Sequence, residues 1–264
     1  MTRSILDDAH AATLADPDDV DARLRFYARL TEAELFLLLE DEAEGDHMRP
    51  RVFPVEDGPM VLAFDSEARL AEFTGLPAPY AALPGRVLLA MLAQADQPLT
   101  LGLNLGVAPS SRVLPPEVLG WLEGILANTP QELQARPRLL SAPSGLPHAL
   151  LAALDAKLAR AAGLASRACL CRVVYEHGAH GHLLGFVDAA PGSEPALTRA
   201  VADALGFSGL EAGALDVAFF AADDPMTRRL EQCGLRFDLP QPQKPQRPDP
   251  VAPGMDPDRP PRLR

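Results

Sequence analysis

Three histidines in a glycine-rich stretch are the first residues whose type and spacing suggest chemistry. His177, His180 and His182 lie in the sequence EHGAHGH. If a strand begins at His180, the side chains of His180 and His182 point the same way, and with His177 across the turn three imidazoles converge on Zn²⁺ or Ni²⁺. The alternative is an exposed turn, because glycine-rich turns give ligand side chains little support. We expect the exposed turn, without a metal.

The three cysteines of the chain suggest packing rather than catalysis. Cys169 and Cys171 precede the histidine turn, and Cys233 lies far along the chain. A hairpin formed at this turn separates the first two from the histidines, so we expect them to be small core residues. Three cysteines are too few for a disulfide framework, which is typical of a reducing compartment. A cytoplasmic location is therefore expected.

Asn104 and Ser110 are the polar residues that we take as candidate ligand or partner contacts. Asn104 interrupts the strand-like run LTLGLNLG, where a buried polar side chain needs hydrogen-bond partners or faces a cleft. A structural hydrogen bond is the alternative for Asn104, and a turn or helix entry is the alternative for Ser110. The glycines around Asn104 do not form a phosphate-binding loop, because no GK(S/T) or GxGxxG pattern is present. No local motif of a catalytic nucleophile is found, so neither catalytic residues nor cofactors are predicted.

Charge argues against some classes of partner. The chain has 24 Lys and Arg against 36 Asp and Glu, a formal net charge of −12, which repels nucleic acid and anionic lipid. The acidic run EDEAEGD at residues 40–46 lacks the ligand spacing of an EF-hand and is expected to be a solvated turn, although it would attract Ca²⁺ or a basic partner. No apolar stretch approaches the ~20 residues of a membrane helix. We therefore expect an unidentified protein partner, with no nucleic acid and no membrane.

The pattern of apolar residues and turn signals predicts an α+β fold. Asp57-Gly58 is a hairpin signal between two β-rich runs, and Ser66, Ser193 and Asp223 are placed to cap helices. Helices are predicted at residues 21–30, 66–73, 85–93, 116–127, 147–163, 193–206 and 223–234. Strands are predicted at residues 34–39, 52–55, 60–64, 99–105, 168–175, 182–187, 215–220 and 235–239. The sequence thus predicts two compact mixed α/β domains, each with an antiparallel hairpin.

Proline-rich segments mark the expected domain boundaries. Residues 135–147, ARPRLLSAPSGLP, interrupt helical patterns on both sides and are read as a linker. From residue 240 to residue 264, nine of 25 residues are proline and few are apolar, so this segment is expected to be a disordered tail. The predicted organisation is a domain at 1–134, a linker at 135–147, a domain at 148–239 and a tail at 240–264.

Several turns and core positions resemble a known family. The matching stretches are the apolar run at residues 35–39, the Asp57-Gly58 hairpin, the helix at 67–73, YAALPGR at 80–86 and residues 101–116. Residues 20–130 resemble the N-terminal domain of the SseB family of bacterial proteins, and residues 147–239 are similar to the C-terminal domain that often accompanies it. The resemblance implies paired α+β domains of no settled activity and supplies no catalytic residues.

The resulting functional expectation is a noncatalytic, cytoplasmic protein-interaction or regulatory module. Tyr80, between Pro79 and a small-residue turn, is the aromatic residue that we expect to contact a partner, with a core position as the alternative. The rival hypothesis is a hydrolase or small-ligand enzyme with a site in a cleft between the domains. The sequence leaves the identity of the partner and the oligomeric state open.

Overall fold

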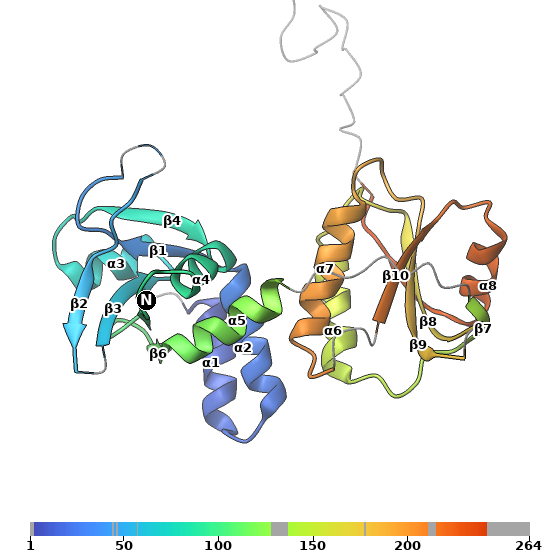
Figure 1. The fold of residues 1–264 in the computed structure, drawn as a ribbon, viewed down its shortest axis with the longest axis horizontal. Helices are drawn as coiled ribbons and strands as arrows, with labels where there is room; N and C mark the ends of the chain where they lie inside the picture. Colours follow the sequence, from blue (N-terminus) through green and yellow to red (C-terminus); the bar gives the residue numbers. More distant parts are fainter. Residues whose placement is uncertain are drawn as a thin grey trace, which may run out of the picture.

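The computed structural model describes residues 3–43, 45, 47–56, 58–127, 137–176, 178–210 and 215–241. Within these residues the chain forms two β-sheets with helices packed against their faces, which is the predicted α+β class (Figure 1). The elements up to residue 127 are α1 (Ile5–Ala15), α2 (Val20–Glu32), β1 (Glu34–Leu38), β2 (Val52–Val55), β3 (Gly58–Phe64), α3 (Glu67–Thr74), β4 (Tyr80–Pro84), α4 (Gly85–Ala93), β5 (Thr100–Leu103), β6 (Arg112–Leu114) and α5 (Pro116–Ala127).

The first sheet has the strand order β4-β1-β3-β5-β6, and β2 pairs with β3. The hairpin predicted at Asp57-Gly58 is confirmed by the antiparallel pairing of β2 with β3, although Asp57 itself lies outside the described residues. Strands β3 and β5 run parallel. A parallel pair needs a crossover connection, and the segment containing α3, β4 and α4 provides it.

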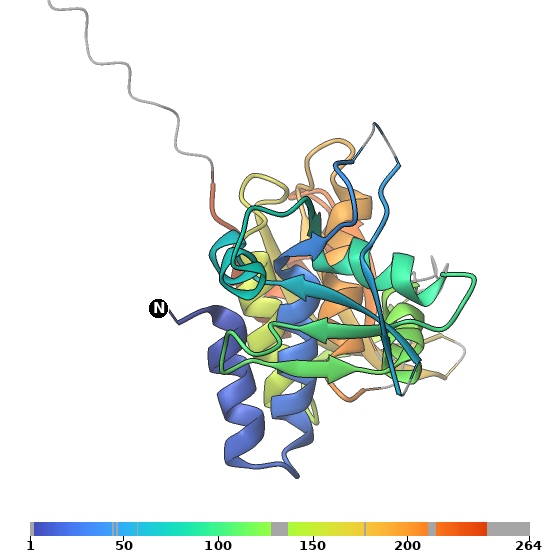
Figure 2. The same ribbon diagram turned by 90° about the vertical axis from the view of Figure 1, so that its left-hand side faces the viewer.

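The two faces of the first sheet are covered unequally. On one face α1, α2, α4 and α5 bury a large core that includes Leu37 and Leu101. Figures 1 and 2 show α1 and α2 side by side in this layer. On the other face α3 covers a smaller cluster around Leu38, Leu62 and Phe64. Because side chains alternate along a strand, the neighbours Leu37 and Leu38 serve opposite faces.

The second sheet is built from the remaining elements and has the order β10-β9-β8-β11, with β7 also paired to β8. Strands β9 and β10 run parallel, and α7 is the helix in their crossover. These elements are β7 (Pro137–Ser141), α6 (His148–Leu158), β8 (Arg167–Tyr175), β9 (His180–Val187), α7 (Glu194–Gly206), β10 (Leu215–Phe220), α8 (Pro225–Cys233) and β11 (Leu235–Asp238).

Helices cover both faces of the second sheet. On one face α6 and α7 bury a core that includes Leu154 and Val201. On the other face α8 places Leu230 over Cys169, Cys171 and Val173. The expectation that the two cysteines are core residues is thereby confirmed, since both are 0% exposed.

The helical layers of the two sheets face each other (Figure 1). Helix α5 contacts α7, and Phe207, just after α7, joins the core of the first sheet. Arg86 on α4 lies 2.5 Å from the carboxylate of Asp203 on α7, and Lys157 on α6 lies 2.7 Å from Glu32 at the end of α2. Apolar contacts and ion pairs therefore both join the two parts.

The predicted helix caps are confirmed at one position and corrected at two. The hydroxyl of Ser66 accepts a hydrogen bond from the backbone N–H of Arg69, as expected for the cap of α3. Helix α8 is capped by Asp224 rather than Asp223, because Pro225 takes the first helical position, where its missing N–H costs nothing. Ser193 precedes α7, but its hydroxyl donates to backbone carbonyls instead of capping the helix.

The predicted linker at 135–147 is wrong in part, because residues 137–141 form β7. This strand pairs antiparallel with β8, its single neighbour among the strands that the structure describes. Proline is tolerated in such a strand because its missing N–H can face away from the partner strand, so the prolines that suggested a linker do not prevent pairing. The second sheet therefore begins inside the segment predicted as a linker.

Most of the predicted proline-rich tail, residues 240–264, lies outside the described residues. Pro240 and Gln241 are described, and both contact the folded part of the chain. The carbonyl of Pro240 accepts a hydrogen bond from the N–H of Gly163, and the amide of Gln241 donates to the carbonyl of Ala165. Among the described residues, no helix has the length and apolar character needed to span a bilayer.

Candidate functional site

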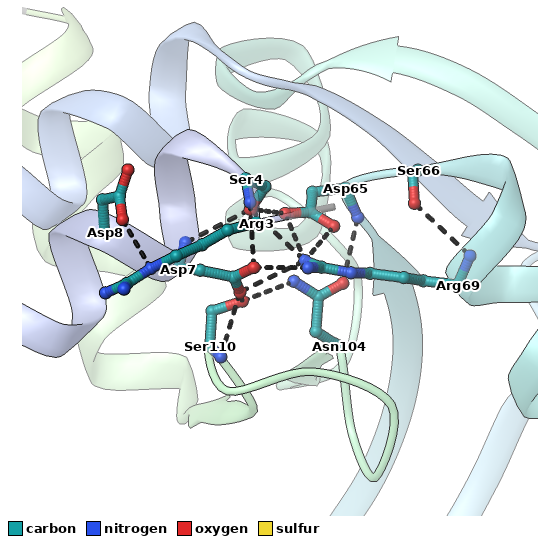
Figure 3. A network of polar contacts seen from close by, with 9 residues as sticks. All are labelled: Arg3, Ser4, Asp7, Asp8, Asp65, Ser66, Arg69, Asn104 and Ser110. Carbon is teal, nitrogen blue, oxygen red and sulfur yellow. Dashed lines mark hydrogen bonds and ion pairs between the residues drawn. The ribbon is translucent and has the colours of Figure 1, made fainter. Parts of the chain in front are cut away.

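Two candidate regions contain residues that the sequence singled out. One is a group of side chains that we call the buried polar cluster, and the other is an apolar surface that we call the open sheet face. The buried polar cluster consists of Ser4, Asp7, Asp65, Arg69, Asn104 and Ser110 (Figure 3). The open sheet face consists of Phe36, Phe53, Met60, Tyr80, Leu105 and Val107.

Arg69 is the centre of the buried polar cluster. It lies in the first turn of α3, and its side chain is 5% exposed. Its guanidinium donates to both carboxylate oxygens of Asp65, at 2.7 and 2.8 Å, and forms an ion pair with Asp7 of α1. Arginine suits this position because its planar group donates several hydrogen bonds in fixed directions. One cation thus joins α3, the end of β3 and the first helix.

Asp7 is held by hydrogen bonds from several directions. Ser4 and Asp7 form a capping box at the start of α1, in which the Ser4 N–H donates to the Asp7 carboxylate at 2.9 Å. The Ser4 hydroxyl in turn donates to Asp65 at 2.6 Å. Burial alone would raise the pKa of Asp7, but hydrogen bonds from Arg69, Ser110 and Ser4 outweigh it and hold this pKa well below its usual value. Asp7 is therefore a buried carboxylate that stays ionised.

Asn104 and Ser110 complete the cluster from the loop between β5 and β6. The Asn104 amide oxygen accepts from the N–H of Asp65 at 3.0 Å, and its amide nitrogen donates to the Ser110 hydroxyl at 2.9 Å. The Ser110 hydroxyl donates to Asp7 at 2.6 Å. Asn104 has a positive φ of 50°, a conformation that asparagine tolerates better than most residues. The loop is thus fixed by side-chain contacts at both ends.

The arrangement of these polar groups suits positioning rather than catalysis. Asn104 and Ser110 are both 0% exposed, and their polar atoms are used inside the chain. Ser110 is hydrogen-bonded to a carboxylate and an amide, so it lacks the neighbouring imidazole that would activate it as a nucleophile. We expected Asn104 either to find hydrogen-bond partners or to face a cleft, and the structure shows hydrogen-bond partners. Direct contact of either residue with a ligand stays a prediction.

The open sheet face lies on the side of the first sheet that α3 covers. Its six residues are only partly buried, and they surround the fully buried Phe64 and the nearly buried Leu38 and Leu62. Gly102 lies between them, where a Cβ atom would come within 2.5 Å of the Leu105 side chain and 2.6 Å of Leu62. The absence of a side chain there lets Leu105 fold back over the sheet.

Tyr80 lies at the outer edge of this face. It is the first residue of β4, which among the described strands pairs with β1 alone, and it stands opposite Leu38. Its ring centroid is 5.5 Å from that of Phe36. Desolvation raises the pKa of Tyr80, and its hydrogen bond with Glu67 and the nearby carboxylates of Glu42 and Glu34 raise it further. Tyr80 therefore combines a packed ring with an acidic environment at a partly exposed position.

The predicted histidine turn is described except for His177, which lies outside the described residues. Strand β9 begins at His180, so His180 and His182 share a face of the hairpin. His180 is exposed, and the Nε2 atom of His182 lies 3.1 Å from the carbonyl oxygen of Ser144. Within the described residues, no group of three or more His, Cys, Asp or Glu side chains is arranged to hold a metal ion.

Sequence reasoning missed Ser4, Asp7, Asp65 and Arg69. Two local signals were available: the Ser-x-x-Asp spacing of the capping box at Ser4 and the four-residue spacing of Asp65 and Arg69. Neither signal shows that the two pairs meet. Asp7 and Arg69 are 62 positions apart, and the fold brings the start of α1 and the start of α3 together at the end of β3.

The fold and the two regions define an α+β protein whose first sheet carries a helical layer on one face and a partly open apolar surface on the other. Residues 6–121 match the family model of the SseB protein N-terminal domain. This match runs from α1 into α5, so it contains the open sheet face and, except for Ser4, the buried polar cluster. The similarity of residues 147–239 to the accompanying C-terminal domain stays a prediction. Comparisons with curated proteins and with solved structures found no match.

Proposed function

We propose that this chain is a noncatalytic interaction module that binds a protein partner through the open sheet face. The observation that carries the proposal is the contrast between the two regions. The side chains of the buried polar cluster are turned inward, whereas Phe36, Tyr80 and their apolar neighbours are partly exposed on one sheet face. Partly exposed aromatic and apolar clusters on a rigid sheet are favourable anchors for protein binding.

Charge around this face supports a partner of specific chemistry. Glu34, Glu42 and Glu67 lie close enough to act on Tyr80, and the acidic segment at residues 40–46 follows β1. A protein segment that presents apolar side chains together with Lys or Arg would complement this surface. The net charge of −12 argues against nucleic acid as the ligand. A cytoplasmic location is part of this proposal, and it is supported by the cysteine content, because three cysteines are too few for a disulfide framework.

The test starts from partners recovered with the full chain from its native host and then measures binding of the purified pair. We expect Tyr80→Ala to weaken binding about 30-fold, the effect of truncating an interface hot spot. Leu14→Ser is the matched control, because Leu14 on α1 is 66% exposed and lies outside the open sheet face. It should bind like the unchanged chain.

Circular dichroism must show that each variant is folded, and raising the salt concentration should weaken binding because exposed charges are screened. A second variant, Phe53→Ala, removes another apolar side chain of the same face. Binding that survives both Tyr80→Ala and Phe53→Ala in folded protein contradicts the proposal. Failure of every recovered protein to bind the purified chain contradicts it as well.

A further inference from the structure

Cys171 and Cys233 lie in contact although they come from different elements. Cys171 is in the middle of β8, and Cys233 is the last residue of α8. Their Sγ atoms are 3.8 Å apart. Disulfide formation needs two sulfurs that can reach bonding distance with small side-chain adjustments, and this pair already begins in van der Waals contact.

The residue after Cys233 makes this contact possible. A Cβ atom at Gly234 would lie 2.8 Å from the Cys171 sulfur and 2.6 Å from the carbonyl oxygen of Leu230. Only glycine therefore lets the end of α8 come this close to β8. From Leu235 onward the chain pairs with β8 as β11, beginning opposite Leu170. The end of α8 is thus held against β8, because the strand that follows it, β11, pairs with β8.

The two thiols differ in access to solvent. Cys171 is 0% exposed, whereas Cys233 is partly exposed and lines an open cleft of about 450 Å³. The same cleft is lined by residues 142–146 and by Leu151, Gly234 and Leu235. A small solute can therefore reach Cys233 from the cleft, and Cys171 lies directly behind it.

We propose that Cys171 and Cys233 form a redox modification site, at which a hydroperoxide that enters the cleft converts the two thiols into a disulfide. Cys233 reacts first because it is the exposed member, and Cys171 resolves the product. This assignment is independent of the proposed interaction function, because it rests on the second sheet alone.

The chemistry balances in two steps. The thiolate of Cys233 attacks one oxygen of the hydroperoxide and breaks the O–O bond, giving a sulfenic acid on Cys233 and an alcohol, or water when the oxidant is hydrogen peroxide. The sulfur of Cys171, losing its proton, then attacks the Cys233 sulfur, forms the S–S bond and releases water. Two thiols are oxidised by two electrons, and one peroxide bond is reduced.

Burial supports the order of these steps. Desolvation, together with the adjacent Cys233 sulfur, raises the pKa of Cys171 well above that of a free thiol. Cys171 is therefore a poor first nucleophile toward a dissolved peroxide, since the thiolate is the reactive form. Once Cys233 carries the sulfenic acid, the short distance between the sulfurs compensates for the small thiolate fraction of Cys171.

The disulfide would change a defined part of the fold. It would link the end of α8 to β8 and fix Cys233 and its neighbours Gly234 and Leu235 at the rim of the cleft. The shape of the cleft would then respond to oxidation, while the second sheet would keep its strand order.

The experiment uses the full chain and hydrogen peroxide. The reduced protein is treated with peroxide, denatured, alkylated and analysed by intact mass and peptide mapping. We expect a loss of two hydrogen atoms, a peptide pair joined through Cys171 and Cys233, a fall from three alkylated thiols to one, and full reversal by dithiothreitol. Oxidation should also raise the melting temperature, because the link closes a long loop.

Matched variants separate this site from general thiol oxidation. Cys169→Ser is the control, because Cys169 is as buried as Cys171 and lies two residues away on the same strand. It should still form the disulfide. Cys171→Ala should instead accumulate a sulfenic acid on Cys233 that a dimedone probe labels, and Cys233→Ser should leave Cys171 reduced.

Three results would overturn the assignment. One is peroxide treatment of the unchanged chain that yields only sulfinic or sulfonic acid on Cys233. Another is a disulfide that joins two molecules or includes Cys169. The third is a Cys169→Ser variant that no longer forms the link while it remains folded. Because this variant keeps both proposed partners, the test does not depend on the folding of Cys171→Ala.

Discussion

Asp7 and Arg69 form an ion pair with side chains that are only 1% and 5% exposed, and this pair joins α1 to α3. Arg69 also pairs with Asp65, so one guanidinium serves two buried carboxylates. Taking charges out of water is costly, and the cost is offset here by hydrogen bonds from Ser4 and Ser110 to the carboxylates. Such a cluster fixes a single arrangement of the elements that it joins.

Replacement of Arg69 is expected to be strongly destabilising. Arg69→Met leaves Asp7 and Asp65 buried without their cation, which typically costs about 3–5 kcal/mol of unfolding free energy. Arg3→Met is the matched control, because the ion pair of Arg3 with Asp8 is 63% and 67% exposed. Its effect should stay within about 1 kcal/mol. Urea denaturation of both variants measures the difference, and equal losses would contradict the structural role assigned to the cluster.

The carboxylate of Asp7 should make the stability of the chain depend on pH in the acidic range. The pKa of Asp7 in the folded chain lies below its value in the unfolded chain, about 3.9, so the unfolded state binds the proton more readily. The stability that Asp7 contributes is therefore fully present above that pH and is lost as the pH falls toward the folded-state pKa. Denaturation midpoints measured from pH 6 downward should fall more steeply for the unchanged chain than for Asp7→Asn. Parallel curves would show that Asp7 does not titrate as described.

His10 should produce a separate loss of stability at higher pH. It is 7% exposed, its Nδ1 atom has no hydrogen-bond partner among the described residues, and its ring lies 5.7 Å from that of Phe26. Desolvation, and then the charge of Arg112, lowers its pKa below 6.5, although Asp7 opposes this. The folded chain thus favours neutral His10, and stability is lost as the pH falls below about 6.5.

The variant His10→Leu removes this titration and should flatten the stability curve just below about pH 6.5. A curve for His10→Leu that keeps the slope of the unchanged chain in this range would contradict the assignment.

Local signals in the sequence were sufficient for many elements of the fold. The cap at Ser66 starts α3, and the β-rich run at residues 215–220 is β10. Strand β4 was missed because YAALPGR, which follows Pro79 and contains Pro84, reads as a turn, whereas its pairing partner β1 lies more than 40 positions away. An edge strand accepts proline, so composition alone does not separate it from a loop.

The candidate site was predictable only where the reason is local. A polar residue in an apolar strand must be satisfied, which singled out Asn104. Its partners Asp65 and Ser110, and the contact of Cys171 with Cys233, depend on how separate elements pack. The local sequence pattern does not show which distant side chains come into contact, so these contacts could be found only in the structure.

Variants of Asn104, Ser110 and Tyr80 distinguish positioning residues from partner contacts. Asn104→Ala leaves the Asp65 N–H and the Ser110 hydroxyl short of a partner and places alanine at a positive φ, so we expect a loss of about 1–3 kcal/mol in unfolding free energy. Ser110→Ala should cost a similar amount, because it removes a hydrogen bond to Asp7. Tyr80→Ala should change stability less and partner binding more.

Folding is checked by circular dichroism and urea denaturation, and binding is measured with the purified partner at a temperature where every variant is folded. Asn104→Ala and Ser110→Ala should then bind within about threefold of the unchanged chain, because binding energy concentrates in exposed apolar and aromatic side chains. Loss of a reproducible activity in a folded Asn104→Ala or Ser110→Ala variant, with partner binding retained, would contradict the interaction module. It would instead favour an enzyme that uses the polar groups of the cluster.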